Sequence, residues 1–545
     1  MTELVLGPVL RRVSATGVTV WVETDRPCRV DVLGHTATTF HVEGHHYALV
    51  DVRDLEPGTT TAYEVRLDGE RAWPRDDGMP PSTIRTLPDD GRLTLVVGSC
   101  QQRAPHESPW TDTSGKDPRA LGPDALLAVA TRMLADEQER PDALLLMGDQ
   151  VYADQPNLAT VAALERRRGG PPAPDWPHVS TFEEYTWLYA DAWGDGLMRW
   201  LLSCVPAFMI FDDHDVIDDW NTSQAWRDDI ERRPWWRSRV QGALMSYWIY
   251  QHLGEAAFRG EADDDLLAEV RAAGDGGPVL RAFADRADAG SPSTVGHRWS
   301  YAHDLGPCRL IVLDSRNGRD LHDDHRTMLG EVEWAWFDDM ARGGDDHVLI
   351  VTSVPWVLPR PIHDLEAWNE EVARGAWGRR AAGIAERIRQ AVDLEHWSAF
   401  GTSFEDLAAV VRSISAGERG PAPATVLALS GDVHFGYVAE LDIGGTSRVR
   451  QVVSSPLRHA SPLTEEKVQR LAMARPASWL ARALARATPR PRPSFDWRLT
   501  EGPWFHNQVA TLELDGRRAT VRAERAVLDD DGRTPRLVPL YERDL

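Results

Sequence analysis

The sequence is poor in cysteine, in basic charge and in long apolar runs, and each shortage excludes a class of protein. Its 545 residues include only Cys28, Cys100, Cys204 and Cys308, without a C-x-x-C pair, which excludes a disulfide-stabilised scaffold. Lys and Arg number 60 against 84 Asp and Glu, a net charge of -24, which argues against general affinity for nucleic acid or anionic membranes. No apolar run approaches the roughly 20 residues that a membrane-spanning helix needs.

The N-terminus carries no recognisable secretory signal. Its first residues, MTELVLGPVLRR, place no basic region before an apolar one. Arg11 and Arg12 are followed by VSATGVTVWVET, an alternating pattern typical of a strand. We therefore expect a cytoplasmic protein without a membrane span, unless a precursor segment has been removed.

Residues 1–88 are predicted to form an all-β sandwich of the immunoglobulin or fibronectin-III-like type. Runs with period-two alternation, separated by turn residues, lie at 17–24, 28–34, 46–55 and 62–69. The stretch LEPGTTTAYEV resembles the L-x-P-G-T…Y-x-x-V pattern of such sandwiches, in which a tyrosine, here Tyr63, fixes a corner. Residues 80–92 are interpreted as a linker.

Residues 92–527 are predicted to form an α/β domain with a layered β-sheet core flanked by helices. Amphipathic segments such as 123–140 and 330–342 separate apolar, strand-like runs at 93–100, 143–149, 205–213, 308–316, 347–356 and 425–434. Strands buried on both faces with intervening helices indicate this architecture. A hairpin is expected at 507–527, turning at Asp515-Gly516, followed by a C-terminal tail at 528–545.

Two insertions interrupt this domain, and both are expected to shape access to its site. Residues 155–180 are rich in Pro, Gly and Arg, and residues 464–493 form a basic, helix-forming stretch that ends in a Pro-rich loop. We interpret the second insertion as a surface helix docked on the body of the protein. A helix that lies on a membrane surface is the alternative.

Several of the predicted strands end in groups that can bind metal ions. The groups are Cys100, Asp149, the acidic run from Asp212 to Asp219, Asp432 and His434. In open α/β sheets the carboxyl ends of the strands form the crevice in which ligands bind. Crowded carboxylates stay ionised only if cations offset their repulsion. The sequence therefore predicts a metal site, although Asp218 and Asp219 are expected to lie in a solvated loop or to cap a helix instead.

Taken in order, these motifs resemble those of the alkaline phosphatase D (PhoD-like) family of calcineurin-like metallophosphoesterases. They are GSCQQ (98–102), MGDQVYAD (147–154), FDDHDVIDDWN (211–221), LDSR (313–316) and SGDVHFG (430–436). The resemblance covers about residues 93–525, and the N-terminal sandwich also fits that family. It implies a phosphoric ester hydrolase, acting on monoesters, diesters or both through a hydroxide that two metals activate.

The resemblance also implies the residues that bind metal. One cation would be held by Cys100, Asp149, Tyr152 and His434, and a second by Asp149, Asp213 and Asp432. Thiolate, phenolate and imidazole suit Fe(III) at the first position, whereas an oxygen-rich second position suits Ca²⁺ or another divalent cation. The chain shows no obvious substitute for the histidine that the superfamily supplies between its third and last motifs; VTSVPW (351–356) stands where it would lie.

Other residues receive roles outside the metal shell. His214 matches a histidine that lies near the phosphate without binding metal, and it would stabilise the transition state or protonate the leaving oxygen. Asp215 is expected to orient His214, and Asp154 is a candidate to assist calcium. Arg316 in LDSR is interpreted as a structural ion pair rather than a phosphate clamp. His396 has no motif around it and receives no role.

Two other functions remain open alongside the hydrolase. The first is a non-catalytic calcium-binding module whose sandwich binds a partner, and the second is a phosphodiesterase specific for lipids or nucleotides. A structural calcium loop would not need Cys100, Tyr152 and His434, which favours the hydrolase. The expected partner is a small phosphate ester, and no nucleic-acid surface is evident.

Overall fold

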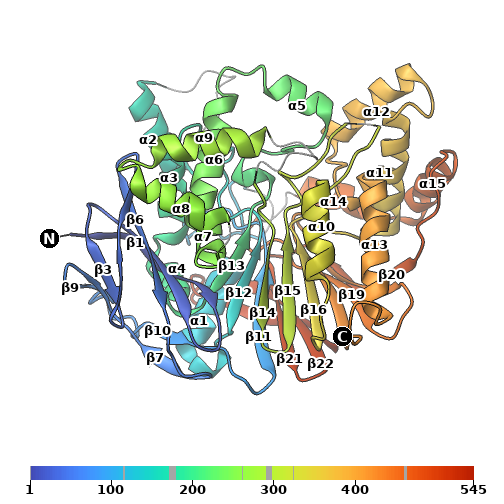
Figure 1. Cartoon of the computed structure of the whole chain (residues 1–545). Helices are drawn as coiled ribbons and strands as arrows, with labels where there is room; N and C mark the ends of the chain where they lie inside the picture. Colours follow the sequence, from blue (N-terminus) through green and yellow to red (C-terminus); the bar gives the residue numbers. More distant parts are fainter. Residues whose placement is uncertain are drawn as a thin grey trace.

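The computed structural model describes residues 2–113, 117–170, 179–260, 262–289, 297–322, 324–459 and 463–545. Residues 171–178 of the first expected insertion lie outside these ranges. Figure 1 shows the N-terminal strands standing beside a layered core of sheets and helices. Among the described residues, no helix has the length and apolar character needed to cross a membrane.

The N-terminal region is all-β, as its alternation predicted. One sheet has the order β1-β2-β6-β5, with β1 at Leu4–Val13, β2 at Val18–Thr24, β5 at Phe40–Val42 and β6 at His45–Val52. The facing order β4-β3-β8-β9 comprises β3 at Arg29–Val32, β4 at His35–Thr38, β8 at Val65–Leu67 and β9 at Glu70–Trp73. A short antiparallel pair joins β7 at Thr60–Ala62 to β10 at Thr83–Arg85. The stretch 80–92, interpreted as a linker, therefore contributes a strand.

The sandwich is attached to the core by buried polar contacts. Tyr63, expected to fix a corner of the sandwich, instead donates its hydroxyl to the carbonyl of Ser203 at 2.7 Å, outside the sandwich. Arg11 forms a fully buried ion pair with Glu255. Because buried charges are stable only when paired, these contacts fix how the two parts meet.

Two sheets form the core. A six-stranded sheet has the order β13-β12-β11-β21-β22-β23, with strands at Ala207–Ile210, Ala143–Met147, Arg92–Gly98, Gln508–Asp515, Arg518–Leu528 and Pro535–Asp544. A seven-stranded sheet has the order β14-β15-β16-β17-β19-β18-β20, with strands at Tyr301–Leu305, Cys308–Leu313, His347–Thr352, Thr425–Ser430, Arg448–Val453, Gly436–Asp442 and Asp496–Trp504. The expectation of a tail at 528–545 was wrong, because β23 pairs with β22 along most of that segment.

Helices occupy the connections between these strands (Figure 1). The first half of the chain contributes α1 (Ala125–Ala135), η1 (Glu137–Glu139), α2 (Leu158–Arg168), α3 (Phe182–Trp193), α4 (Gly196–Cys204), η2 (Asp213–Asp215), α5 (Gln224–Ile230), α6 (Trp236–Ser246), η3 (Tyr247–His252), α7 (Leu253–Ala256), α8 (Ala262–Ala272) and α9 (Gly277–Asp288). The second half contributes α10 (Glu331–Met340), α11 (Arg360–Ala373), α12 (Arg379–Ala391), η4 (Trp397–Ala399), α13 (Gly401–Ser415), α14 (Leu463–Ala472) and α15 (Arg475–Arg486). α15 packs against α11, so the second insertion is docked on the body as expected.

The parallel strands are buried along their length, which explains their continuous apolar sequences. Every residue of β12 (ALLLM) and β16 (HVLIVT) is buried. β11, β12 and β13 run parallel in one sheet, and β15, β16 and β17 run parallel in the other. Their carboxyl ends carry the motifs identified in the sequence, and this arrangement positions the candidate site.

Candidate metal centre

The backbone is strained where the predicted ligands leave the strands. Cys100, Asp149, Asp432 and His434 have φ values of 60°, 53°, 66° and 56°. Non-glycine residues in this left-handed region are uncommon, and each costs on the order of 1–3 kcal/mol that the rest of the fold must offset. Such strain clusters at functional sites, so its coincidence with the predicted ligands supports a site here.

A thiol, a carboxylate and an imidazole converge from three strand ends. Ligand atoms of Cys100, Asp149 and His434 all lie within 4.8 Å of one another. These residues follow β11, β12 and β17, so both sheets contribute. The hydroxyl of Tyr152 donates to Oδ2 of Asp149 at 3.4 Å, which places the predicted phenolate ligand beside the same group.

Burial favours the neutral forms of these groups when no cation is bound. Burial raises the pKa of the Cys100 thiol well above its usual range, and the carboxylates of Asp149 and Asp432 add to the rise. Burial also raises the pKa of Asp149 well above normal. Burial and the positive charge of His214 lower the pKa of His434 to about 4, which keeps its imidazole in the neutral, metal-binding form. A nearby cation would favour the thiolate and carboxylate that binding requires.

A second group consists of oxygens alone. Ligand atoms of Asp149, Asp212 and Asp213 also lie within 4.8 Å of one another. In the described part of the chain, Oδ1 of Asp149, Oδ2 of Asp212 and Oδ1 of Asp213 are buried without a hydrogen-bond partner. Buried carboxylate oxygens are normally paired. Oδ1 of Asp213 lies 3.2 Å from the guanidinium of Arg316, so the oxygens of Asp149 and Asp212 are the ones that fit a hard cation best. Asp212 had received no individual role from the sequence.

Arg316 lies fully buried between the acidic groups. Its guanidinium contacts Asp212, Glu395 at 2.5 Å, Asp213 at 3.2 Å and Asp432 at 3.3 Å. The interpretation of LDSR as a structural ion pair therefore agrees with its contacts. Its fixed positive charge offsets part of the repulsion among these carboxylates.

His396, to which the sequence analysis assigned no role, contacts the predicted ligand Asp432. Its Nε2 lies 2.9 Å from Oδ2 of Asp432, and its Nδ1 lies 2.7 Å from Oε1 of Glu366. Burial alone would raise the pKa of Asp432, but the hydrogen bond from His396 and the charge of Arg316 hold that pKa far below normal. In the sequence, only the adjacent acidic residue Glu395 marked His396 as a candidate. The two residues that His396 contacts, Glu366 and Asp432, lie 30 and 36 positions away in the chain.

His214 is oriented by Asp154 and not, as expected, by Asp215. Nδ1 of His214 lies 2.9 Å from Oδ2 of Asp154. Asp215 instead accepts from the backbone N–H groups of Asp149 and Asp212, both at 3.0 Å, and so holds two strand ends together. Asp154 was a candidate to assist calcium, and its carboxylate is engaged by His214.

Asp218 is exposed, as expected of a solvated loop, but neither Asp218 nor Asp219 caps α5. Ser223 is the N-cap of α5, its side chain accepting from Trp226. Asp219, expected to cap, donates its backbone N–H to Asp213 at 3.0 Å.

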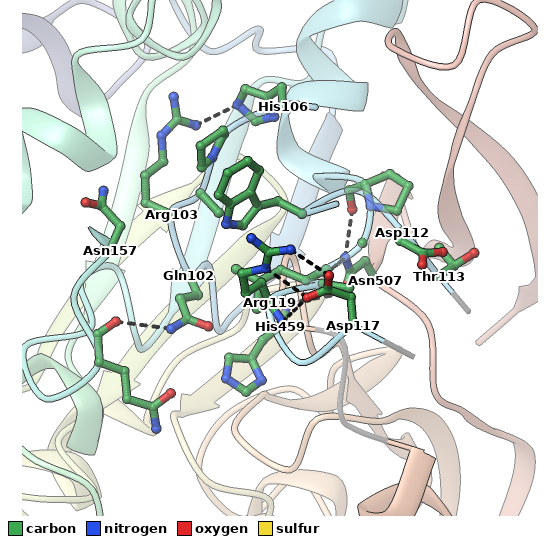
Figure 2. A pocket seen from close by; sticks show the side chains of 18 of the residues that line it. Gln102, Arg103, His106, Asp112, Thr113, Asp117, Arg119, Asn157, His459 and Asn507 are labelled. Atoms are coloured by element: carbon green, nitrogen blue, oxygen red, sulfur yellow. Dashed lines mark hydrogen bonds and ion pairs between the residues drawn. The ribbon is translucent and has the colours of Figure 1, made fainter. Parts of the chain in front are cut away.

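A cavity of about 990 Å³ adjoins the metal-binding groups. The link is His459, which lines the cavity while its ring stacks on those of His434 and Tyr152, with centroids 4.2 and 5.4 Å away. Figure 2 shows this cavity, with Gln102 and His459 on the same side and Arg103, His106 and Asn157 across from Asp112 and Thr113. His459 lay outside the quoted motifs and was missed.

The charges that line the cavity are already paired. Arg103 contacts Asp195 at 3.1 Å, and Arg119 contacts Asp117 at 2.8 Å (Figure 2). Arg119 also lies over the ring of Trp110 at 5.8 Å. The cavity therefore offers an aromatic face and polar groups more than an excess of positive charge.

Two solved structures are similar to this chain. A solved structure described as that of PhoD is 12% identical, with coverage of 99% of this chain and 90% of its own and a TM-score of 0.55, which shows a shared fold. Purple acid phosphatase PPD1 from yellow lupin (Lupinus luteus) seeds is 10% identical, with a TM-score of 0.45. The match covers 95% of this chain and 71% of the lupin chain. No curated protein matches.

Family models match two parts of the sequence. A domain of unknown function, DUF7800, matches residues 1–84. The PhoD-like phosphatase model matches residues 124–490, well over half of the chain and the part that contains most of the converging side chains. The protein therefore belongs to the PhoD-like phosphatase family.

Proposed function

We propose that this protein hydrolyses phosphate esters with the help of two bound cations. The observation that carries the proposal is the convergence of Cys100, Asp149 and His434 within 4.8 Å, from separate strand ends, with Cys100 and Asp149 buried and His434 half-buried. A structural calcium loop has no use for a thiol or an imidazole, because calcium prefers oxygen ligands. The mixed donor set therefore supports a catalytic metal site.

Two different cations suit the two groups of side chains. Cys100, Asp149, Tyr152 and His434 would hold Fe(III), for which thiolate, phenolate and imidazole are suitable ligands. Asp149 and Asp213 would hold Ca²⁺ or another divalent cation with oxygen ligands. Asp213 would bind through oxygens that already contact Arg316 or the backbone N–H of Asp219. Asp432 would join them through an oxygen that already contacts Arg316 or His396.

Bound cations would lower the pKa of water and polarise the phosphoryl oxygens. His214 supplies the proton chemistry of the chain itself. Burial alone would lower the pKa of His214, but the carboxylates of Asp154 and Asp213 raise it well above its usual value. The cationic imidazole, fixed through Nδ1 by Asp154, can stabilise negative charge on the phosphoryl group or protonate the leaving oxygen from Nε2.

The cavity beside His459 would accept the organic part of the ester. Its two arginines are already paired with aspartates, and the ring of Trp110, with Arg119 over it, also lines the cavity. An aromatic or polar alcohol suits this lining better than a second phosphate does. Replacing Trp110 with Ala should raise KM for an aryl phosphate several-fold while leaving kcat nearly unchanged.

The decisive experiment measures metal content and activity together. Purified protein would be assayed for bound iron and calcium, and for turnover of an aryl phosphate and of the matching bis-aryl diester. Asp149→Asn should lose both metal and turnover, because both groups of ligands share this carboxylate. The two esters distinguish monoesterase from diesterase activity.

Asp142→Asn is a matched control. Asp142 precedes the same strand, β12, at its opposite end, where its carboxylate accepts from the backbone of Thr94 at 2.7 Å. This variant should keep its metal and its turnover. Full metal content and wild-type turnover in Asp149→Asn would refute the shared-ligand assignment, and a metal-loaded wild type inactive on both esters would refute hydrolysis.

A further inference from the structure

A second cluster of metal-binding side chains lies apart from the candidate metal centre. Ligand atoms of His252, Asp263 and His297 all lie within 4.8 Å of one another. They come from different segments: His252 ends η3, Asp263 lies in α8, and His297 precedes β14. No motif in the sequence joined these residues, and the proposed phosphatase chemistry does not use them.

The spacing of the three side chains suits a coordination shell in which the carboxylate of Asp263 faces both imidazoles. Nε2 of His252 lies 3.4 Å from Oδ2 of Asp263, Nε2 of His297 lies 3.4 Å from Oδ1 of Asp263, and the two Nε2 atoms are 3.4 Å apart. Tetrahedral zinc, with bonds of about 2.0–2.1 Å to nitrogen and oxygen, places its ligand atoms about 3.4 Å from one another.

Hydrogen bonding accounts poorly for the same geometry. N–H···O bonds normally span about 2.7–3.2 Å, so contacts of 3.4 Å to Asp263 are long. Two imidazole nitrogens that face one another can share only one proton. A cation between the three side chains would satisfy both Nε2 atoms and the carboxylate together.

The surroundings hold the three side chains in place. Trp248 donates its indole N–H to Oδ1 of Asp263 at 2.8 Å, the kind of contact that orients a ligating carboxylate. The ring of Trp299 packs edge-on against His252 and His297, with centroids 5.0 and 4.4 Å away. His252 also ends a π-helical turn, a rare conformation that is frequent at functional sites.

We propose that His252, Asp263 and His297 bind a divalent transition metal, for which Zn²⁺ is the best match, at a structural site. The side chains are only 1%, 8% and 8% exposed, so access for a substrate is restricted. The cation would tie η3, α8 and the segment before β14 into one unit. Helix α8 contacts β5 of the sandwich. Helix α7, which follows η3, contacts β1 and β2. The site would therefore also stabilise the attachment of the sandwich to the core.

The test counts zinc in full-length protein whose phosphatase centre has been disabled. In a Cys100→Ser, Asp149→Asn, His434→Gln background, which removes ligands from both groups of the phosphatase centre, metal-free protein reconstituted with Zn²⁺ and desalted should retain one equivalent per chain. Adding Asp263→Asn or, separately, His297→Gln should remove that equivalent. Zinc X-ray absorption of the background protein should show nitrogen and oxygen neighbours without sulfur.

His303→Gln is a matched control, because His303 is a buried histidine of the neighbouring strand β14 that pairs with Glu255 at 3.3 Å. It should keep the zinc equivalent. Failure of the background protein to retain zinc, or equal zinc in the background, Asp263→Asn and His297→Gln proteins, would overturn the proposal. Neither result depends on phosphatase activity, so the proposed function is tested separately.

Discussion

Nδ1 of His214 lies 2.9 Å from Oδ2 of Asp154, a residue 60 positions earlier in the chain. The same Asp154 oxygen accepts the backbone N–H of Asp218 at 2.9 Å, so the carboxylate cannot turn away freely. This contact assigns the proton on His214 to Nδ1 in the neutral ring and leaves Nε2 for the substrate. Asp154 therefore acts as a positioning residue for His214.

Replacing Asp154 with Asn should lower kcat by about 10- to 100-fold, the usual cost of losing an orienting carboxylate. Removing the imidazole with His214→Ala should cost more, about 10²- to 10⁴-fold. Both proteins should keep their metal, because neither residue is a proposed ligand. Steady-state kinetics with metal analysis checks these values, and Asp154→Glu should recover part of the activity. Equal kcat in wild type and Asp154→Asn would rule out a positioning role.

Replacing Arg316 with Met should destabilise the protein by about 3–5 kcal/mol, because it leaves buried carboxylates without their counter-charge. The measurement is the free energy of unfolding from urea titrations of metal-loaded protein. Arg119→Met serves as the comparison, since the Arg119–Asp117 pair is largely exposed and should matter little. A similar small effect for both variants would show that the acidic groups do not depend on Arg316.

Replacing His396 with Gln should weaken metal binding by about 10- to 100-fold, because Asp432 loses the hydrogen bond that favours its ionised form. His363→Gln is a suitable control: His363 is equally buried, but its ring packs on Phe404 and Trp497 instead of contacting a carboxylate. Competition with a chromophoric chelator measures the affinity. If the metal affinity of His396→Gln were unchanged, Asp432 would not be a ligand of the metal centre.

The sandwich should loosen from the core as the pH rises through about 8. His45 in β6 lies 2.8 Å from Glu23 and 3.0 Å from Glu183 of α3. Burial alone would lower the pKa of His45, but these carboxylates raise it from 6.5 to about 8. A pKa raised by folding adds stability that is complete below the unfolded value of about 6.5 and is lost above the folded value.

The expected loss is about 1 kcal/mol, after allowance for screening at the partly exposed Glu183. Urea unfolding of wild type and His45→Gln at about pH 6 and about pH 9 measures it. The difference in stability between the two proteins should shrink at the higher pH. If the difference in stability between the two proteins stayed constant across this pH range, His45 would be excluded as the source of the pH dependence.

The sequence by itself determined the classes of structure and the chemistry at the strand ends. Continuous apolar runs predicted parallel strands such as β12 and β16, because strands covered on both faces have no polar side. Short motifs placed Cys100, Asp149 and His434 directly after such strands, and parallel strands bring their carboxyl ends to one edge. These features are local in the chain, so local patterns could predict them.

Only the tertiary structure decided which distant groups pair. His396 contacts Asp432, Asp154 contacts His214, and the segment 528–545 adds β23 to a sheet. The cluster of His252, Asp263 and His297 joins three segments that share no motif. Side chains from separate segments meet only when the packing of helices and sheets brings them together, and the spacing of residues along the chain does not encode that packing.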